Sequence, residues 1–512
     1  MLLLVAGASA SAETYEEILE LARTLTINGE WDRALEEYSR ALKLKPKSPL
    51  VYHERGIVYG ELGLHDKAIE DFSLAISYKN DLTEAYYNRG LSYHETGQHV
   101  KAIEDYTRAL ARRPREPRIY YNRGIAYRSN GQDHKAIRDY STAVALDPKY
   151  FEAWFNRGYA YSAMKQYDRA IRDFTRAIAL KKDYADAYYC RGFALHHVGR
   201  VDAALKDFTR AIALDPKHVE AYYDRGVVYR LAGRIDDAIA DFSRAIALEP
   251  DHIRSLLNRG GQYNDKGQHD KALVDLTRVV TLDPKETSGW INRGCALAGL
   301  GRYDDAILDY TRALALEPTR ASAYNNRGYM WRVKGDYAKA LDDLNRAIAI
   351  APKYVAPTCH RGLTFFALGR YDEAIRDHTR TIELMPKHTY SHLWRYLARE
   401  RAGKDGRTDL ARFAEKATDR QWPFMIVRMY LGEIAPGKIL AAAEAQKDLE
   451  PAKRFEVYYY VGQFHLLQGD ANTARVLFGK CRAADYDSLS AYAAARAELK
   501  RLEKPPTHGD PP

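Results

Sequence analysis

Long hydrophobic runs and metal-ligand patterns are both missing from this sequence. No apolar stretch among its 512 residues is long enough to cross a bilayer, so no transmembrane helix is predicted. The cysteines number only four, lie far apart and follow no zinc-binding spacing. We expect free, packed thiols at Cys190, Cys295, Cys359 and Cys481.

Signatures of catalysis are missing as well. The sequence contains neither a glycine-rich phosphate loop nor a Gly-x-Ser-x-Gly elbow. His196 and His197 are adjacent on one predicted helix and therefore point in different directions, and no acid or cysteine set completes a metal site with them. We therefore expect no catalytic residue, no cofactor, no metal and no enzymatic activity.

What the chain does contain is a strict repeat. The dipeptide Arg-Gly recurs every 34 residues, ten times in succession. The arginines of this series are Arg55, Arg89, Arg123, Arg157, Arg191, Arg225, Arg259, Arg293, Arg327 and Arg361. A constant period of this length indicates a stack of identical supersecondary units.

The residues around each Arg-Gly repeat in step. In the unit that starts at Thr83, aromatic residues stand at positions 4, 11 and 24, and glycines at positions 8 and 15. Gly97 follows the first predicted helix, where the left-handed conformation is needed, and proline follows the second. Each helix is expected to be about 12 to 14 residues long and stable only when stacked.

This pattern resembles the tetratricopeptide repeat over residues 15–388, as eleven consecutive units of 34 residues. The resemblance implies an all-α, right-handed superhelical solenoid of stacked helix-turn-helix units, with a helical cap region at the C-terminal end. The family's usual residue at the Arg position is leucine, which faces the partner helix.

A buried arginine at that place needs an acidic partner, since an unpaired buried charge is costly. An aspartate recurs at position 23 of every Arg-Gly unit, for example Asp105 and Asp139. We therefore predict an internal Arg–Asp ladder with one rung per repeat.

The formal net charge of +9 raises the question of nucleic acid. A second arginine series follows the repeated acids by three residues, as in Arg108, Arg278 and Arg380, where i,i+3 pairing is expected. A solvated, self-paired surface accounts for this charge better than a nucleic-acid stripe, because no base-reading motif accompanies it.

The repeat breaks down after residue 388. Residues 389–504 are expected to be helical, with a degenerate repeat near 455–488, and residues 505–512 are expected to be disordered. Motifs around Trp394, Trp422 and Tyr458–Gly462 resemble the C-terminal region of NlpI-type repeat lipoproteins of bacterial envelopes. That resemblance implies an adaptor that holds a periplasmic protease or cell-wall hydrolase together with its client.

The N-terminus suggests export. Residues 1–12 have the apolar run and small-residue end of a signal peptide, without a basic leading region. The lipidated cysteine of NlpI-type proteins is not matched, since Glu13 follows the candidate cleavage site. We expect a periplasmic or secreted protein without a membrane anchor, the alternative being a cytoplasmic one.

The candidate binding surface is the groove lined by the first helices. The sixth position carries Asn88, Asn122, Asn156, Asn258, Asn292 and Asn326. The fifth position carries Tyr87, Tyr121, Phe155, Tyr189 and Tyr223. A carboxamide both donates and accepts, which suits a peptide backbone, but hydrogen bonding between neighbouring helices is an equal alternative.

Two functions are compatible with these features. The first is a non-catalytic scaffold or adaptor that binds extended peptides or partner proteins in the groove, and a folded partner or its own copy through the C-terminal helices. The second is an organiser of a polysaccharide-export or cell-wall assembly complex.

Overall fold

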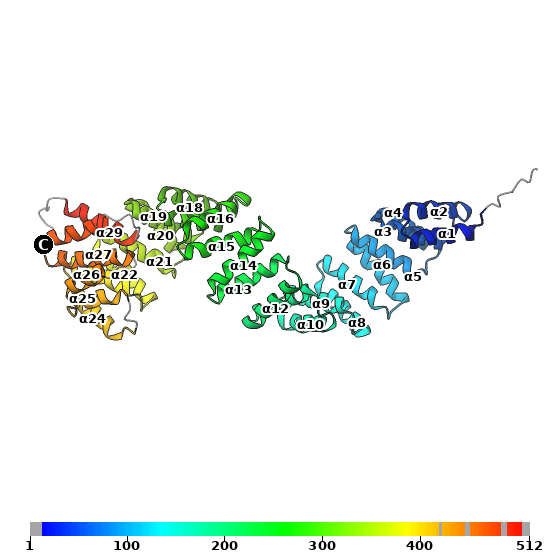
Figure 1. Ribbon diagram of the computed structural model, residues 1–512, viewed down its shortest axis with the longest axis horizontal. Coiled ribbons are helices and arrows are strands. Elements are labelled where there is room, and N and C mark those ends of the chain that lie inside the picture. Colours follow the sequence, from blue (N-terminus) through cyan, green and yellow to red (C-terminus); the bar gives the residue numbers. More distant parts are fainter. Residues whose placement is uncertain (1–12, 419–421, 446–450, 483–488, 504–512) are drawn as a thin grey trace, which may run out of the picture. The chain divides into compact units, whose positions relative to one another are not determined.

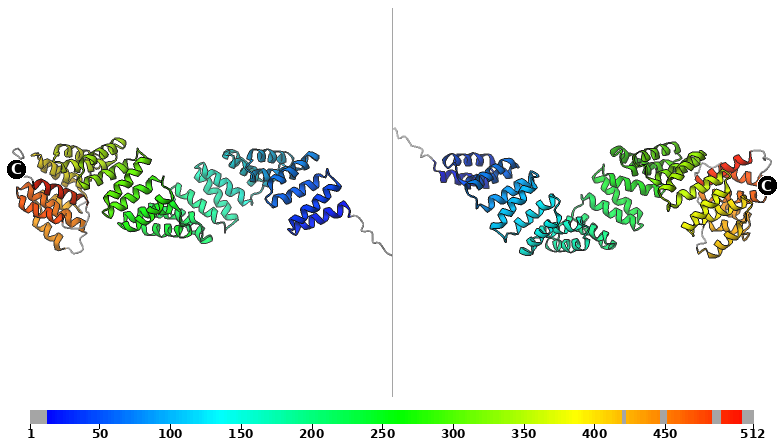
Figure 2. Two further views of the ribbon diagram at one scale, coloured as in Figure 1. Left: turned by 90° about the horizontal axis from the view of Figure 1, so that it is seen from above. Right: turned by 180° about the vertical axis from the view of Figure 1, so that it is seen from behind.

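The structure is a computed structural model that describes residues 13–418, 422–445, 451–482 and 489–503. Within those ranges it contains 29 helices and no strand, which confirms the all-α prediction. The chain divides into two compact units, Met1–Asp241 and Phe242–Pro512. In each unit, consecutive helix pairs lie side by side (Figures 1 and 2). The predicted signal peptide and C-terminal tail lie outside the described residues.

Eleven helix pairs precede residue 388, and the starts of their first helices keep the 34-residue spacing of the sequence. The first helices are α1 (Tyr15–Ile27), α3 (Pro49–Glu61), α5 (Thr83–Glu95), α7 (Pro117–Ser129), α9 (Phe151–Ala163), α11 (Ala185–His197), α13 (Val219–Leu231), α15 (Ile253–Asp265), α17 (Thr287–Gly299), α19 (Ala321–Lys334) and α21 (Val355–Ala367). The second helices are α2 (Trp31–Leu44), α4 (His65–Tyr78), α6 (His99–Arg112), α8 (Asp133–Leu146), α10 (Tyr167–Leu180), α12 (Val201–Leu214), α14 (Ile235–Leu248), α16 (His269–Leu282), α18 (Tyr303–Leu316), α20 (Tyr337–Ile350) and α22 (Tyr371–Leu384).

Glycine at position 15 ends the first helix of most repeats, as expected. Gly97 has φ of 74°, and its amide donates to the His94 carbonyl at 2.9 Å. The repeat of α9 and α10 has no glycine there, and Lys165 adopts the left-handed conformation instead, with φ of 59°. A side chain in that conformation costs about 1 kcal/mol, so the turn geometry is imposed by the helices on either side.

Glycine at position 8 allows the two helices of one repeat to touch. A Cβ added at Gly124 would lie 2.6 Å from the ring of Tyr140, and one at Gly90 would lie 2.7 Å from Tyr106. Both rings are almost fully buried. The aromatic side chain of the second helix therefore packs directly on the backbone of the first.

The predicted Arg–Asp ladder is present in full. Arg123 donates through Nε to Asp139 Oδ2 at 2.7 Å and through Nη2 to Asp139 Oδ1 at 2.9 Å. Equivalent pairs, each at 2.7–2.8 Å, join Arg55–Asp71, Arg89–Asp105, Arg157–Asp173, Arg191–Asp207, Arg225–Asp241, Arg259–Asp275, Arg293–Asp309, Arg327–Asp343 and Arg361–Asp377. The hydrogen bonds with Asp71 raise the pKa of Arg55 above its usual value.

The same arginines also reach the preceding repeat, which the sequence did not indicate. Arg123 Nη1 donates to Thr107 Oγ1 at 3.0 Å, and Thr107 Oγ1 donates in turn to the Ile103 carbonyl at 2.7 Å. Eight of the other nine arginines make the same contact, and their acceptors are Ser39, Ser73, Ser141, Thr175, Thr209, Ser243, Thr311 and Asn345. Among the described residues Arg293 bonds to Asp309 alone. One guanidinium therefore joins three helices from two repeats.

The prediction for the second arginine series is wrong for several members. Arg108 does pair with Asp105, three residues earlier, at 3.0 Å. Arg278 instead contacts Asp251 on the preceding turn, and Arg380 contacts Glu383. These long side chains are about half exposed and can reach several nearby acids. They therefore do not all pair with the aspartate three residues earlier.

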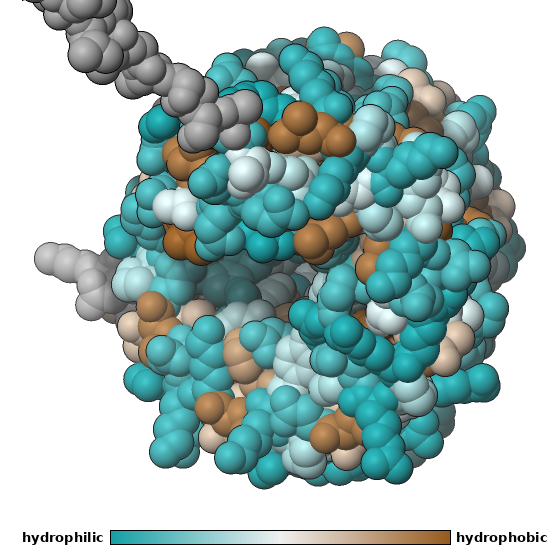
Figure 3. Space-filling model, turned by 90° about the vertical axis from the view of Figure 1, so that its right-hand side faces the viewer, coloured by the Kyte–Doolittle hydropathy of each residue, from teal (hydrophilic) through white to brown (hydrophobic). Residues whose placement is uncertain are grey.

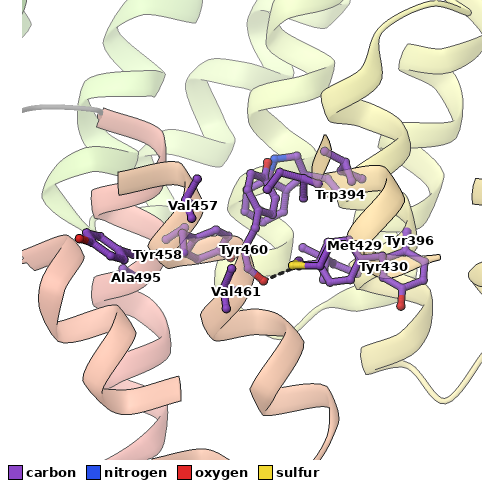
Figure 4. Packing of buried hydrophobic residues seen from close by; sticks show 14 of the residues in the cluster. Trp394, Tyr396, Met429, Tyr430, Val457, Tyr458, Tyr460, Val461 and Ala495 are labelled. Carbon is purple, nitrogen blue, oxygen red and sulfur yellow. Dashed lines mark hydrogen bonds between the residues drawn. The ribbon is translucent and has the colours of Figure 1, made fainter. Parts of the chain in front are cut away.

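The C-terminal region has its own aromatic core within the second unit. Its helices are α23 (Thr389–Arg401), α24 (Arg407–Lys416), α25 (Phe424–Tyr430), α26 (Pro436–Ala445), α27 (Pro451–Leu467), α28 (Ala471–Arg482) and α29 (Leu489–Leu502). Trp394, Tyr430 and Tyr460 pack together, and the Tyr430 hydroxyl donates to the Tyr460 carbonyl at 2.8 Å (Figure 4).

Two contacts relate this region to the repeats. In α27 and α28 a Cβ at Gly462 would lie 2.6 Å from Phe478, the same contact that glycine and an aromatic residue make inside each repeat. Arg501 of α29 donates to the carbonyls of Phe366 and Ala367, at 3.1 and 2.9 Å. A cation at the carboxyl end of a helix is favourable, so α29 stabilises the last turn of α21.

His378 of the last repeat occupies the place that an aromatic residue or leucine holds elsewhere. Its ring is fully buried and lies nearly parallel to that of Trp394, with centroids 6.4 Å apart. Neither ring nitrogen has a hydrogen-bond partner among the described residues. Burial lowers the pKa of His378 to about 3, so this imidazole stays neutral.

We expect His378 to make the C-terminal region sensitive to acid. A histidine with a depressed folded pKa is protonated preferentially in the unfolded chain, so stability falls as the pH drops below about 6.5. The share of the loss at pH 5 that comes from His378 is expected to be about 2 kcal/mol, in addition to a similar share from His360. Urea unfolding at pH 7 and pH 5 measures it, and His378→Phe should reduce the difference. An unchanged pH dependence in that variant would refute this role.

Candidate peptide-binding surface

The residues predicted to bind a peptide are half-buried on the first helices. Tyr87, Tyr121, Phe155, Tyr189 and Tyr223 belong to α5, α7, α9, α11 and α13 of the first unit. Asn88, Asn122 and Asn156 lie in the same unit on α5, α7 and α9. Asn258, Asn292 and Asn326 lie in the second unit, on α15, α17 and α19.

In the first unit, the fifth residue of one repeat bonds to the sixth residue of the next. Asn122 Nδ2 donates to the Tyr87 hydroxyl at 2.8 Å, and Asn156 Nδ2 donates to the Tyr121 hydroxyl at 3.1 Å. His53 and Asn88 are linked in the same way at 3.1 Å. These hydrogen bonds join successive first helices, which is the structural alternative that the sequence left open.

Asn122 and Asn156 differ in how many of their remaining side-chain polar atoms are already hydrogen-bonded. Asn156 also donates to the Glu152 carbonyl at 3.0 Å, and its oxygen accepts from Arg128 at 3.3 Å. Asn122 donates to the Arg118 carbonyl at 3.1 Å. Within the described structure the Asn122 oxygen accepts no hydrogen bond, whereas Asn156 is fully engaged.

In later repeats of the first unit, the sixth position holds a residue other than asparagine, namely Cys190 or Asp224. Phe155 packs with Cys190 in one apolar cluster, so no polar link is needed there. The Tyr189 hydroxyl donates to Asp224 Oδ2 at 2.9 Å. Burial and the adjacent Asp224 carboxylate raise the pKa of Tyr189.

In the second unit the link is interrupted at Asn292. The fifth residue of the preceding repeat is Leu257, which has no polar side-chain atom to offer. The backbone carbonyl of Asn292 accepts a hydrogen bond from Asn264 Nδ2 at 2.8 Å. Its carboxamide makes no hydrogen bond with any residue that the structure describes.

A second difference leaves open space beside this carboxamide. The ninth residue of a repeat contacts the sixth residue of the next: Asn326 Nδ2 lies 3.5 Å from Cys295 Sγ, and Tyr329 stacks on His360 with centroids 4.6 Å apart. Before Asn292 the ninth residue is Gly261, and a Cβ built there meets only Asn292 Nδ2, at 3.9 Å. Asn292 is thus half-buried, unpaired and next to unfilled space.

The face of the molecule drawn in Figure 3 is mainly polar. Viewed from the N-terminal end, hydrophilic residues dominate and the apolar ones form separate small patches (Figure 3). No helix among the described residues is both long and apolar enough to span a membrane. In the same residues, histidine, cysteine and acidic side chains form no group that could hold a metal ion.

Comparison with protein families settles what kind of repeat this is. Models described as "Tetratricopeptide repeat" match residues 197–253, 228–286, 291–355, 83–116, 151–184 and 50–82, and a "TPR repeat" model matches 22–63 and 126–165. Together these ranges cover more than half of the chain. The chain belongs to the tetratricopeptide-repeat family. Proteins of this family are generally non-catalytic interaction scaffolds.

Solved structures of other tetratricopeptide-repeat proteins resemble parts of this one. A crystal structure of MamA is 30% identical, with 32% of this chain and 95% of that chain covered and a TM-score of 0.31. The structure of YrrB, "a TPR protein with an unusual peptide-binding site", is 28% identical, with 36% and 95% covered and a TM-score of 0.34. Yeast Tom70 is 16% identical, with 85% and 99% covered and a TM-score of 0.37. None of these matches identifies NlpI-type proteins.

The residues around Asn292 were only partly foreseeable. Asn292 was predicted as one of six equivalent asparagines. Its distinction comes from Leu257 and Gly261 in the preceding repeat, and this signal is readable only when positions five and nine are compared across a repeat boundary. Gly261 stands in a helix, where glycine has no conformational role, and that alone could have drawn attention to it.

Proposed function

We propose that this tetratricopeptide-repeat protein is a scaffold that binds an extended peptide segment along the first helices, with its main polar contact at Asn292. The unpaired Asn292 carboxamide beside Gly261 carries the proposal. A carboxamide can donate to a backbone carbonyl and accept from a backbone amide of the same peptide. The missing side chain at Gly261 leaves room for that backbone to approach.

The first unit offers a weaker version of the same contact. The Asn122 oxygen is free to accept, and the Tyr87 hydroxyl, which accepts from Asn122, still has its own hydrogen to donate. Tyr121, Phe155, Tyr189 and Tyr223 provide aromatic surface on the following first helices, where partner side chains can pack. We propose these residues of the first unit as contacts for a second peptide segment.

The proposal predicts that filling the space at Gly261 weakens binding without loss of fold. A phage-displayed random peptide library is selected on the full chain, and the affinity of an enriched peptide is measured by fluorescence polarisation. Gly261→Leu and Asn292→Ala should each weaken binding at least about tenfold, ~1.4 kcal/mol. Gly261→Leu should melt no lower than the parent, because leucine favours a helix over glycine.

Asn156→Ala is the matched control. Its carboxamide is fully engaged within the protein, so this variant should lose stability while keeping the affinity for the selected peptide. Peptides that bind equally to the parent, Gly261→Leu and Asn292→Ala would refute the proposed contact. Failure to enrich any peptide would refute peptide binding itself.

We further propose that the protein works in a bacterial envelope, as an adaptor for a protease or cell-wall hydrolase. The support is the signal-like sequence of residues 1–12 and the NlpI-like motifs after residue 388. Cell fractionation followed by N-terminal sequencing tests this. The proposal predicts a processed chain in the periplasmic fraction, and an intact Met1 in the cytoplasm would contradict it.

A further inference from the structure

A cavity of about 430 Å³ lies in the second unit, away from the peptide-binding surface. It is bounded by the end of α22, by α23 and by α24. Arg395 and Asp409 line it, and Lys387, Arg412 and Lys416 surround its exposed rim. Four cationic side chains therefore face this space, and Asp409 is the one acidic side chain among the described residues that line it.

The single acid is shared among several arginines. Asp409 lies 2.8 Å from Arg399, 3.5 Å from Arg412 and 3.7 Å from Arg395. One carboxylate cannot neutralise three guanidinium groups, so the cluster keeps a net positive charge. A partly buried charge without a counter-charge is costly.

Arg395 lines the cavity and lies farther from Asp409 than the other two arginines do. Its side chain is only 16% exposed, and its guanidinium makes no hydrogen bond to any described residue. Burial lowers its pKa, which shows how little the surroundings compensate the charge. A guanidinium presents its donors in a planar fork that matches a carboxylate or phosphate.

Beside the charged groups and two threonines, Thr389 and Thr418, the cavity walls are largely apolar. Ile382, Pro386 and Ala417 line one part of it. His392 stacks on Phe413 with ring centroids 3.8 Å apart and planes 14° from parallel, and its Nε2 bonds to the Pro386 carbonyl at 3.0 Å. Burial lowers the pKa of His392, so this pair forms a neutral, flat wall.

We propose that this cavity binds a small organic anion, a carboxylate or phosphate joined to an apolar or aromatic body. The anionic group pairs with Arg395, and the body packs against Phe413 and the other apolar walls. Such a group can come from a free small molecule or from the C-terminal residue of a peptide, because both present a carboxylate next to an apolar group.

Isothermal titration calorimetry on the full chain tests the proposal. The probes are 3-phenylpropionate, phenyl phosphate and the neutral 3-phenylpropionamide. We expect saturable binding of the two anions and at least tenfold weaker binding of the amide. Short peptides ending in phenylalanine, as free acid and as amide, show whether a chain terminus or a free acid binds more tightly.

Variants assign the binding to this cavity. Arg395→Gln should weaken anion binding at least tenfold, whereas Arg380→Gln, on the exposed face of α22 and paired with Glu383, should leave it unchanged. Asp409→Asn removes the competing carboxylate and should strengthen binding. Because this variant is expected to bind the anion more tightly, it tests the proposal even if Arg395→Gln unfolds. Equal binding of acid and amide, absence of saturable anion binding, or weaker binding in Asp409→Asn would overturn the proposal.

Discussion

Nine of the ten arginines of the Arg-Gly series join three helices, and the stacking of the repeats depends on that contact. Arg123 holds Asp139 with two donors and the Thr107 hydroxyl of the preceding repeat with a third. Its side chain is 16% exposed and that of Asp139 only 6%, so neither charge could stay there alone. A shift of one repeat along the next would break every such contact together, which fixes the register of the stack.

Because these contacts repeat so regularly, a departure from them is informative. At Asn292 two contacts between repeats are absent, one for lack of a polar atom on Leu257 and one for lack of a side chain on Gly261. The cavity beside Arg395 is a departure of another kind, because Arg395 lies 3.7 Å from an acid, Asp409, that it shares with Arg399 and Arg412, whereas each repeat arginine holds its aspartate with two hydrogen bonds. At both proposed sites, a polar side chain lacks hydrogen bonds that the equivalent or similar side chains make elsewhere in the chain.

The sequence revealed the fold and the Arg–Asp pairs because both follow from fixed spacing within one repeat. It did not reveal the role of Thr107, since a hydroxyl on a helix can equally bond to the carbonyl four residues earlier, and here it does both. The second arginine series was predicted wrongly for residues such as Arg278, because exposed side chains choose acids on adjacent turns. The distinction between Asn156 and Asn292 depends on contacts across repeats, which the spacing within one repeat does not contain.

The most direct test of this account is the coupling between Arg123 and Thr107 across a repeat boundary. A double-mutant cycle of Arg123→Met and Thr107→Val, followed by urea unfolding, measures it. A hydrogen bond to a buried charged group predicts a coupling of about 1 to 2 kcal/mol. The exposed pair Arg302 and Asp305, treated in the same way, should give at most about 0.5 kcal/mol. Additive effects of Arg123→Met and Thr107→Val would contradict the claim that these arginines join the repeats.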